Sequence, residues 1–185
     1  AAFSKQLDAL QIPVYFETEA TEIIMDGGKA VGVKAVSEKT DYTINAGAVI
    51  LATGGFGANE EMYCSYRPDL KGTVTTNAPG ATGDGIVMAE AVGAGLVDID
   101  QIQLHPTVEQ STSMLITEGV RGDGAILVNQ SGKRFTNELL TRDKVSAAEL
   151  EQEGSYAYVI FDQNLRDNLA AIEKYVKNNI VVEAP

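Results

Sequence analysis

A continuous apolar run, Ala46–Ala52 (AGAVILA), leads directly into the glycine cluster Thr53-Gly54-Gly55-Phe56-Gly57. An uninterrupted run of this kind is typical of a strand that is buried on both faces of a sheet, and it favours an α/β fold. Glycines at the end of such a strand leave backbone amides bare, and ligands of open α/β sheets lie beyond the carboxyl ends of the strands. The feature therefore predicts a ligand site, unless the glycines form only a turn.

A second glycine-rich stretch, residues 77–85, precedes a helix pattern over Ile86–Val92. Amide groups at a helix N-terminus attract phosphate, whereas Asp84 could instead cap the helix or accept a hydroxyl proton. Two glycine loops, each joined to a buried element, favour a dinucleotide or similar cofactor. No GxGxxG follows a first strand, so no complete nucleotide-binding fold begins in this chain.

The segments before the apolar run predict a small meander attached to a larger sheet. Pro13 ends an N-terminal helix, and Asp26-Gly27-Gly28 supplies the positive-φ residues of a tight hairpin. The expected elements are a helix over 1–10 and strands over Val14–Phe16, Ala20–Met25, Ala30–Val36 and Asp41–Asn45.

The pattern of predicted helices and strands changes near Asp98. The pattern predicts strands over Met114–Glu118 and Ala125–Asn129, a turn at Gln130-Ser131-Gly132, and a return strand over Arg134–Thr136. It also predicts helices over Lys144–Leu150 and Leu165–Tyr175, with a buried strand over Tyr156–Phe161 between them.

Composition limits the function classes. A formal net charge of −12 over 185 residues argues against nucleic acid or an anionic membrane surface as a partner. No apolar run approaches the roughly 20 residues that span a bilayer. The single cysteine, Cys64, suits a reducing compartment, so we expect a cytoplasmic location, with a periplasmic one open for a longer parent. Five of the fourteen basic residues fall between Arg121 and Lys144, which indicates either an anion site or a solvated face.

His105 is the only histidine, and Thr117, Glu118, Arg121 and Arg142 follow it. Donors, a carboxylate and fixed cations are the groups that hold a substrate carboxylate and move a proton. The structural alternatives are a satisfied core histidine, ordinary strand composition at Thr117, and a salt bridge of Arg142 with Asp143 or Glu138. One histidine and one distant cysteine are too few soft ligands to predict a metal site, and no GxSxG nucleophile elbow is present.

Three stretches carry a family resemblance. LHPT with the later ITEGVRGDGAILVNQSGKRFTNELLTRDKVSAA closely resembles the soluble, flavocytochrome c-type fumarate reductases of the succinate dehydrogenase/fumarate reductase flavoprotein family. ILATGGFGAN and GATGDGIVMAEAVGAG are similar to FAD-domain segments of that family. The resemblance implies that residues 1–99 belong to a glutathione-reductase-type FAD-binding domain and residues 100–185 to the start of an α+β capping domain.

The resemblance also implies roles for the site residues. His105 and Thr117 would bind one carboxylate of a small dicarboxylate, while Glu118 and Arg121 would form a proton relay ending at Arg142. A hydride from the flavin would reach one alkene carbon, and Arg142 would protonate its neighbour. The acid role of Arg142 rests on the resemblance alone, because a guanidinium normally keeps its proton. The implied FAD contacts are Ala52, Thr53, Gly54 and Gly55, with Ala20 at the adenine end and Thr82, Gly83 and Asp84 nearby.

The resemblance further predicts that this chain is an internal fragment. The family's GxGxxG, its second substrate histidine and its second substrate arginine do not appear in the sequence, nor does a CxxCH haem motif. We therefore expect the chain alone to bind FAD poorly and to be inactive. The alternatives are an alkene reductase of the urocanate or 3-oxosteroid type, an aspartate oxidase, and a non-catalytic binding module. The sequence leaves the electron donor and the oligomeric state open.

Overall fold

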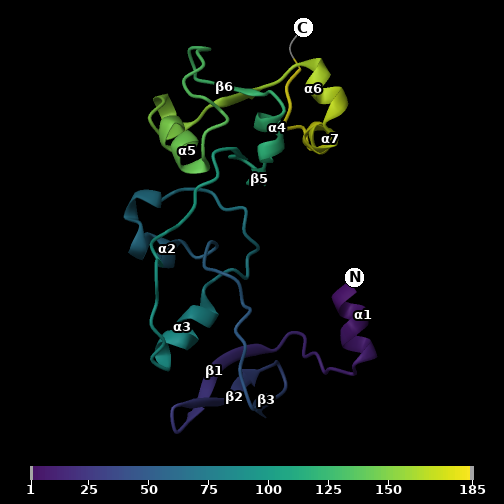
Figure 1. Cartoon of the computed structure of the whole chain (residues 1–185), viewed down its shortest axis with the longest axis vertical. Helices are drawn as coiled ribbons and strands as arrows, with labels where there is room; N and C mark the ends of the chain where they lie inside the picture. Colours follow the sequence, from purple (N-terminus) through teal and green to yellow (C-terminus); the bar gives the residue numbers. More distant parts are fainter. Residues whose placement is uncertain (1, 184–185) are drawn as a thin grey trace. The chain divides into compact units, whose positions relative to one another are not determined.

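The computed structural model describes residues 2–183, which contain both helices and strands, as predicted (Figure 1). The chain divides into two compact units. One comprises Ala1–Met62 and Pro79–Asp98, and the other comprises Tyr63–Ala78 and Ile99–Pro185. No helix within the described residues is long and apolar enough to cross a bilayer. The assignment of residues 1–99 and 100–185 to two named domains stays a prediction.

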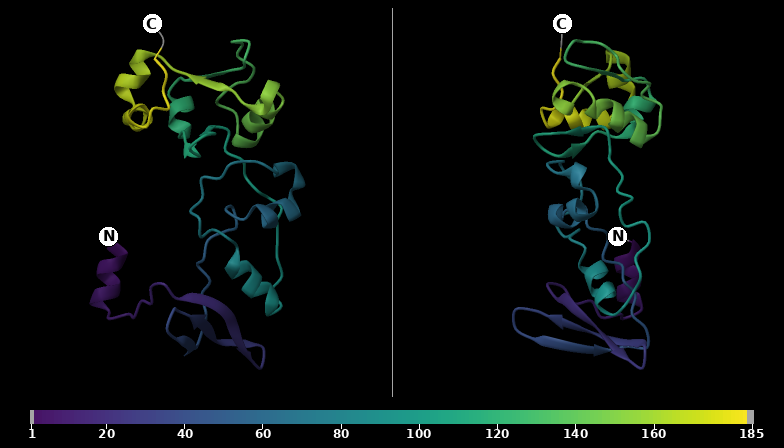
Figure 2. Two further views of the ribbon diagram at one scale, coloured as in Figure 1. Left: turned by 180° about the vertical axis from the view of Figure 1, so that it is seen from behind. Right: turned by 90° about the vertical axis from the view of Figure 1, so that its left-hand side faces the viewer.

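The first unit contains a three-stranded antiparallel sheet, whose strands lie side by side in Figure 2. Gly27 and Gly28, in the turn between the first two strands, have φ values of 55° and 81°, which glycine adopts without steric cost. Gly32 permits the close approach of the third strand, because a Cβ there would lie 2.3 Å from the Ile44 carbonyl oxygen. The predicted hairpin and third strand are confirmed as β1 (Glu19–Asp26), β2 (Lys29–Val36) and β3 (Asp41–Asn45).

The N-terminal segment agrees only in part with the prediction. Helix α1 (Ala2–Ala9) forms where a helix was expected over residues 1–10, although it buries no side chain and residue 1 lies outside the described residues. The strand predicted over Val14–Phe16 is wrong: these residues are exposed and belong to no strand. Apolar composition alone does not form a strand, since the backbone also needs a neighbouring strand to bond.

The prediction of a buried strand over Ala46–Ala52 is also wrong for the described structure. None of the sheets formed by residues 2–183 includes this segment, and the Ile50 side chain is 89% exposed. A strand buried on both faces requires partner strands and covering layers. The described residues supply neither of them here, so the segment forms no strand and most of it is exposed.

Two helices follow the three-stranded sheet along the chain. Helix α3 (Asp84–Ala91) lies against β1 and buries Met88, which confirms the helix predicted over Ile86–Val92. Helix α2 (Glu60–Tyr66) starts after Asn59, whose side-chain oxygen accepts a hydrogen bond from the Met62 amide at 3.0 Å. This bond satisfies one of the donors that a helix N-terminus leaves free.

The second unit is built around a core of Val120, Ala125, Leu165, Ile172 and Tyr175. Its strands form two short antiparallel pairs. The elements are η1 (Pro68–Leu70), β4 (Val108–Glu109), β5 (Met114–Leu115), α4 (Glu118–Gly122), β6 (Ile126–Val128), α5 (Arg142–Leu150), η2 (Glu153–Ser155), β7 (Tyr158–Ile160), α6 (Gln163–Asn168) and α7 (Ala170–Lys177). Strand β4 pairs with β5, and β6 pairs with β7.

Several elements of this unit differ from the prediction in length or burial. The strand expected over Met114–Glu118 stops at Leu115, and Glu118 instead begins α4. The helix expected over Leu165–Tyr175 is interrupted at Leu169, whose φ and ψ of −110° and 100° are extended. Strand β7 is not buried as predicted, since Tyr158 and Ile160 are about half exposed. The return strand over Arg134–Thr136 is reduced to one bridge with Val128.

Candidate active site

His105 lies in a loop of the second unit, and its two ring nitrogens have different partners. The Thr107 amide donates a hydrogen bond to His105 Nδ1 at 3.3 Å. His105 Nε2 lies 3.3 Å from Glu118 Oε1, and the imidazole is 14% exposed. Because Nδ1 accepts a hydrogen bond, the neutral ring holds its proton on Nε2, where it can donate.

Thr107 connects the histidine loop to the start of α4. Its hydroxyl donates to the Ile116 carbonyl at 2.7 Å, and the Ile116 amide donates to the Thr107 carbonyl at 2.9 Å. Thr107 is only 3% exposed, so these bonds are made away from water. The pairing holds His105 opposite Glu118.

Helix α4 supplies three of the predicted residues within five positions. Thr117 is the N-cap residue of this helix. Its amide donates a hydrogen bond at 2.9 Å to Oη of Tyr175, which belongs to the core. The Thr117 hydroxyl makes no capping bond within the described part of the chain, which leaves it available to a ligand. Glu118 and Arg121 follow at positions i and i+3 of one helical face.

Arg142, at the start of α5, forms an ion pair with Glu118 Oε1. Its Nη1 also donates to Gln103 Oε1 at 2.5 Å. The alternative salt bridges of Arg142 with Asp143 or Glu138 do not form within residues 2–183, where Arg142 pairs with Glu118 and the carboxylate of Glu138 binds Arg134. One carboxylate oxygen of Glu118 therefore faces both His105 and Arg142.

Arg121 is a buried cation, 5% exposed. Its Nη1 donates to the Glu138 carbonyl at 2.7 Å, and its Nε has no hydrogen-bond partner among residues 2–183. Burial lowers the pKa of Arg121, while the charges of Glu149 and Glu138 act in the opposite direction. Arg121 is thus held in a site that disfavours its charged form.

The electrostatics of this cluster favour an anionic ligand. Burial lowers the pKa of His105, and the charges of Arg142 and Arg121 lower it further. A lowered histidine pKa leaves the ring neutral at neutral pH. Two guanidinium groups and the single carboxylate of Glu118 then give the four residues a net positive charge, which can bind a carboxylate and supply protons.

The predicted cofactor residues gather separately, within the first unit. Gly83 is the left-handed N-cap of α3, with φ of 89°, and a Cβ there would lie 2.4 Å from Met62 Sδ. A Cβ on Gly85 would lie 2.1 Å from Thr53 Oγ1, so the helix start and the glycine cluster are in direct contact. The Asn59 side chain also donates to the Thr82 carbonyl at 2.9 Å.

The surroundings of this contact fit a planar cofactor. Ala52–Gly55 are exposed, and no atom lies within 4 Å of an ideal Cβ on Gly54 or Gly55. A flat group could therefore lie against their bare backbone. Thr82 Oγ1 donates to Asp84 Oδ2 at 2.7 Å, which places two polar groups at the helix start. Ala20 is exposed on β1, opposite Ala35.

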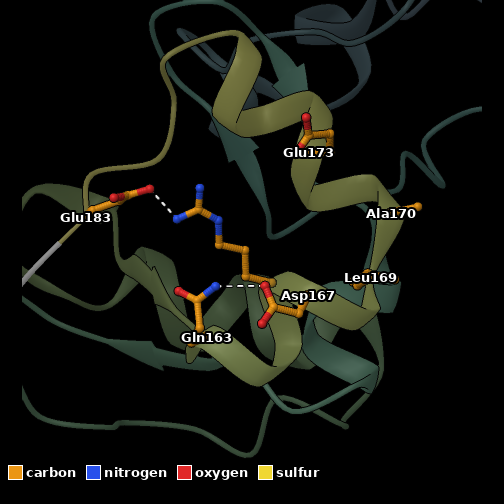
Figure 3. A pocket seen from close by; sticks show the side chains of 7 residues that line it. Gln163, Asp167, Leu169, Ala170, Glu173 and Glu183 are labelled. Atoms are coloured by element: carbon orange, nitrogen blue, oxygen red, sulfur yellow. Dashed lines mark hydrogen bonds and ion pairs between the residues drawn. The ribbon is translucent and has the colours of Figure 1, made fainter.

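A surface pocket of about 670 Å³ lies at α6 and α7, and none of the predicted site residues lines it (Figure 3). Across it, Arg166 forms an ion pair with Glu183, and Gln163 donates to Asp167 at 2.7 Å. Its lining contains no histidine, and its single arginine is paired with a surface carboxylate, so it lacks the imidazole and the buried guanidinium of the His105 cluster. It is lined by Gln163, Arg166, Asp167, Leu169, Ala170, Glu173 and Glu183.

Sequence reasoning missed three supporting residues, Gln103, Thr107 and Tyr175, and it assigned Glu138 to Arg142, whereas Glu138 binds Arg121 and Arg134. Gln103 had a usable signal, because residues two apart in an extended segment share a side and Gln103 precedes His105 by two. Thr107 lies within the LHPT motif itself. Tyr175 could not be found from spacing, since 58 positions separate it from Thr117.

Comparison with known proteins identifies relatives along nearly the whole chain. The family profile described as "FAD binding domain" matches residues 1–182. An NADH:fumarate oxidoreductase from Klebsiella pneumoniae (strain 342) is 50% identical, over 94% of this chain and 19% of its own length. A fumarate reductase (cytochrome) from Shewanella frigidimarina is 48% identical, over 89% of this chain and 29% of its own length.

A solved structure agrees with these matches. The open conformation of a flavocytochrome c3 fumarate reductase has a TM-score of 0.78 and 39% identity to this chain, over 94% of this chain and 31% of the solved one. This chain therefore spans less than a third of the length of each of these three relatives.

Proposed function

The chain belongs to the FAD binding domain family, and from that premise we propose that it forms part of an FAD-dependent fumarate reductase. The observation that supports this most is the cluster in which one oxygen of Glu118 faces both His105 and Arg142, with Arg121 one helical turn away. Such a cluster can bind a dicarboxylate and deliver a proton to it.

His105 and Thr117 are the groups that bind one substrate carboxylate in this proposal. The Nε2 proton of the neutral imidazole and the free hydroxyl of Thr117 are both donors. Fixed donors stabilise the negative charge that develops beside a carboxylate when an alkene carbon accepts a hydride. The net positive charge of the cluster also favours a dianionic substrate over a neutral one.

Arg142 is the proton donor, and its ion pair with Glu118 defines the route by which it regains a proton. Glu118 is paired with Arg142 and precedes the buried Arg121 by three positions on α4, so in this proposal the carboxylate passes a proton from Arg121 to Arg142. Burial lowers the pKa of Arg121, which makes release of its proton less costly than in water. The electron donor of the reaction is left open by these residues.

The residues that would hold FAD are Ala52–Gly55 and Thr82–Asp84, with Ala20 on β1 as a further contact. When bound, FAD supplies the hydride that fumarate reduction requires. The chain's own contribution there is the exposed backbone of Gly54 and Gly55 and the start of α3.

The proposal is tested with the full-length flavoprotein that contains this segment, purified with FAD and supplied with an artificial reductant. We expect reduction of fumarate, and loss of roughly 10²- to 10⁴-fold in kcat for Arg142→Met, the range for removal of a general acid. Arg166→Met is the matched control, since the Arg166 guanidinium on α6 pairs with Glu183 and lies outside the proposed site. Reduction of urocanate or a 3-oxosteroid without reduction of fumarate would replace the proposed substrate with one of these alkenes.

A further inference from the structure

Arg121 is held by a neutral oxygen, although a buried carboxylate belongs to the same partner residue. Its Nη1 donates to the backbone carbonyl of Glu138 at 2.7 Å. The Glu138 side chain is only 2% exposed, and its carboxylate binds Arg134 and the Leu127 amide. A guanidinium bonds more strongly to a carboxylate than to a neutral carbonyl. The carboxylate of Glu138 would therefore be the preferred partner of Arg121 if it were free to turn.

Arg134 holds both oxygens of that carboxylate. Glu138 Oε1 accepts hydrogen bonds from the Leu127 amide at 2.8 Å and from Arg134 Nε at 2.9 Å. Glu138 Oε2 accepts from Arg134 Nε at 3.1 Å and from Arg134 Nη2 at 2.5 Å, and within residues 2–183 it bonds to Arg134 alone. A guanidinium that binds through two nitrogens fixes the direction of a carboxylate as well as balancing its charge.

The backbone of Arg134 is itself anchored beside β6. Arg134 forms the single bridge with Val128, and the Lys133 amide closes the preceding turn by donating to Asn129 Oδ1 at 3.0 Å. The Arg134 side chain is 57% exposed, so its charge keeps contact with water. Arg134 can therefore hold the buried carboxylate without the cost of burying its own charge.

Arg121 and Glu138 carry complementary groups that do not meet. Arg121 Nε is a buried donor without a hydrogen-bond partner among the described residues. Without Arg134, Glu138 Oε2 would be a buried acceptor without a partner, and an unsatisfied buried donor and acceptor are stabilised by pairing. Burial lowers the pKa of Arg121, but the charges of Glu149 and Glu138 already oppose this. Loss of Arg134 should therefore turn the Glu138 carboxylate toward Arg121.

We propose that Arg134 is a positioning residue of the proton relay, which holds the Glu138 carboxylate away from Arg121 and leaves Arg121 only a neutral acceptor. The inference rests on the proposed function above. Per turnover Arg121 gives one proton to Glu118 and regains one from water, so the net transfer is one proton from solvent to the product. A carboxylate in contact with Arg121 would hold that proton in an ion pair, whereas the carbonyl of Glu138 orients the guanidinium and lets the proton leave.

Kinetics of the full-length flavoprotein, purified with FAD and supplied with an artificial reductant, test this. In Arg134→Met we expect kcat per bound FAD to fall roughly tenfold, less than the loss for a direct general acid. The solvent deuterium isotope effect on kcat should increase, because proton release by Arg121 becomes slow relative to hydride transfer. KM for fumarate should not change, since the substrate-binding groups are unaltered. The control is Lys133→Met, which removes the adjacent exposed cation and should reproduce the unmodified values.

A second substitution removes the group that Arg134 restrains. In Arg134→Met/Glu138→Gln no carboxylate is left at position 138 to pair with Arg121, while the backbone carbonyl remains. We expect kcat and the isotope effect of this double variant to return to those of Glu138→Gln alone. Arg134→Lys, which keeps the charge but cannot bind both oxygens in the same way, should lie between Arg134→Met and the unmodified enzyme. A double variant no faster than Arg134→Met would overturn the inference.

A purely structural role of Arg134 predicts a different pattern. Arg134→Met would then lower the melting temperature or the FAD content, while kcat per bound FAD and the isotope effect stayed as in the unmodified enzyme. That result would overturn the inference and leave the proposed function in place, because the unmodified enzyme would still reduce fumarate.

A crystal structure of the full-length Arg134→Met flavoprotein tests the geometry whatever the substrate is. We expect the Glu138 carboxylate within hydrogen-bond distance of the Arg121 guanidinium. A carboxylate that stays on the Leu127 amide, with Arg121 still bound by the carbonyl alone, would overturn the inference. Failure of the unmodified enzyme to reduce fumarate would instead reject the proposed function, since the crystal structure tests the separation of Glu138 from Arg121 independently of catalysis.

Discussion

Glu118 is the residue on which the candidate active site depends, because a single carboxylate oxygen faces both the imidazole of His105 and the guanidinium of Arg142. Glu118→Gln keeps the shape of the side chain but removes the charge. We expect kcat for fumarate in the full-length flavoprotein to fall by roughly 10²-fold or more, the effect of losing an acid–base group. KM should change much less, because His105 and Thr117 still bind the carboxylate.

Steady-state kinetics across several fumarate concentrations separate these two effects. Glu173→Gln is a matched control, since Glu173 is an exposed carboxylate that pairs with Lys177 on α7. A Glu118→Gln enzyme with a raised KM and a normal kcat would instead place Glu118 among the substrate-binding groups.

His105 offers a direct test of the site's electrostatics, because a chain with one histidine gives one set of imidazole resonances. We expect an NMR titration to give a pKa below the ordinary 6.5, owing to burial and the two arginines. Arg142→Gln should raise this pKa part of the way back, while Arg166→Gln should leave it unchanged. A pKa at or above 6.5 in the unmodified chain would contradict the buried, neutral imidazole.

The same pKa shift affects stability in a definite direction. The unfolded chain binds the His105 proton more readily than the folded one, so this group lowers the free energy of unfolding as the pH falls from about 6.5 through the folded pKa.

Among the structural elements, the loop between β6 and α5 depends on Glu138. Its carboxylate accepts hydrogen bonds from Arg134 and from the Leu127 amide at 2.8 Å, and its carbonyl accepts from Arg121. Burial alone would raise the pKa of Glu138, but these hydrogen bonds outweigh it and the pKa is lowered. The carboxylate therefore stabilises the fold above its unfolded pKa, and that stability is lost as the pH falls through the folded value.

Glu138→Gln should lower the free energy of unfolding by about 2–3 kcal/mol at neutral pH, the contribution of hydrogen bonds to a charged group. Urea denaturation measures this difference, which should shrink in acid as the native carboxylate is protonated. Glu173→Gln, which removes only an exposed ion pair, should cost less than about 1 kcal/mol. Equal losses in the two variants would show that Glu138 is not the support inferred for this loop.

The elements that sequence predicted well are those with local causes. The β1–β2 hairpin follows from Gly27 and Gly28, and α3 follows from its own periodicity. The prediction of a buried strand over Ala46–Ala52 failed because a buried strand needs neighbouring strands, and no local sequence pattern shows whether they are present. The prediction of one continuous helix over Leu165–Tyr175 failed for a related reason. No glycine or proline stands at Leu169 to signal the extended backbone that interrupts it. The candidate active-site residues were predicted from a sequence motif. Gln103 and Tyr175 were identified only in the structure, through contacts with residues distant in the sequence.

At the scale of the whole chain, the exposure of apolar side chains and the comparisons with known proteins both indicate that this chain is part of a larger protein. The predicted kinship with the fumarate reductase flavoproteins is confirmed, yet the chain spans only 19% and 29% of the two curated relatives' lengths. Side chains that ordinarily form a core are open to solvent, among them Phe3, Phe16, Ile50 and Val97, each more than 80% exposed. Large exposed apolar surface of this kind marks surface that other protein normally covers.

The isolated 185-residue chain should accordingly fail to retain FAD. The backbone of Ala52–Gly55 is exposed along its length, so it offers a flavin an open surface and no enclosing walls, and enclosure is what ligand sites of this size ordinarily provide. The measurement is the visible absorption spectrum of the purified chain after incubation with excess FAD and desalting, with the full-length flavoprotein treated in parallel. We expect a flavin band from the full-length protein and none from the chain. A stoichiometric band from the chain would mean that residues 1–185 complete the cofactor site by themselves, and the fumarate assay should then be performed on the chain directly.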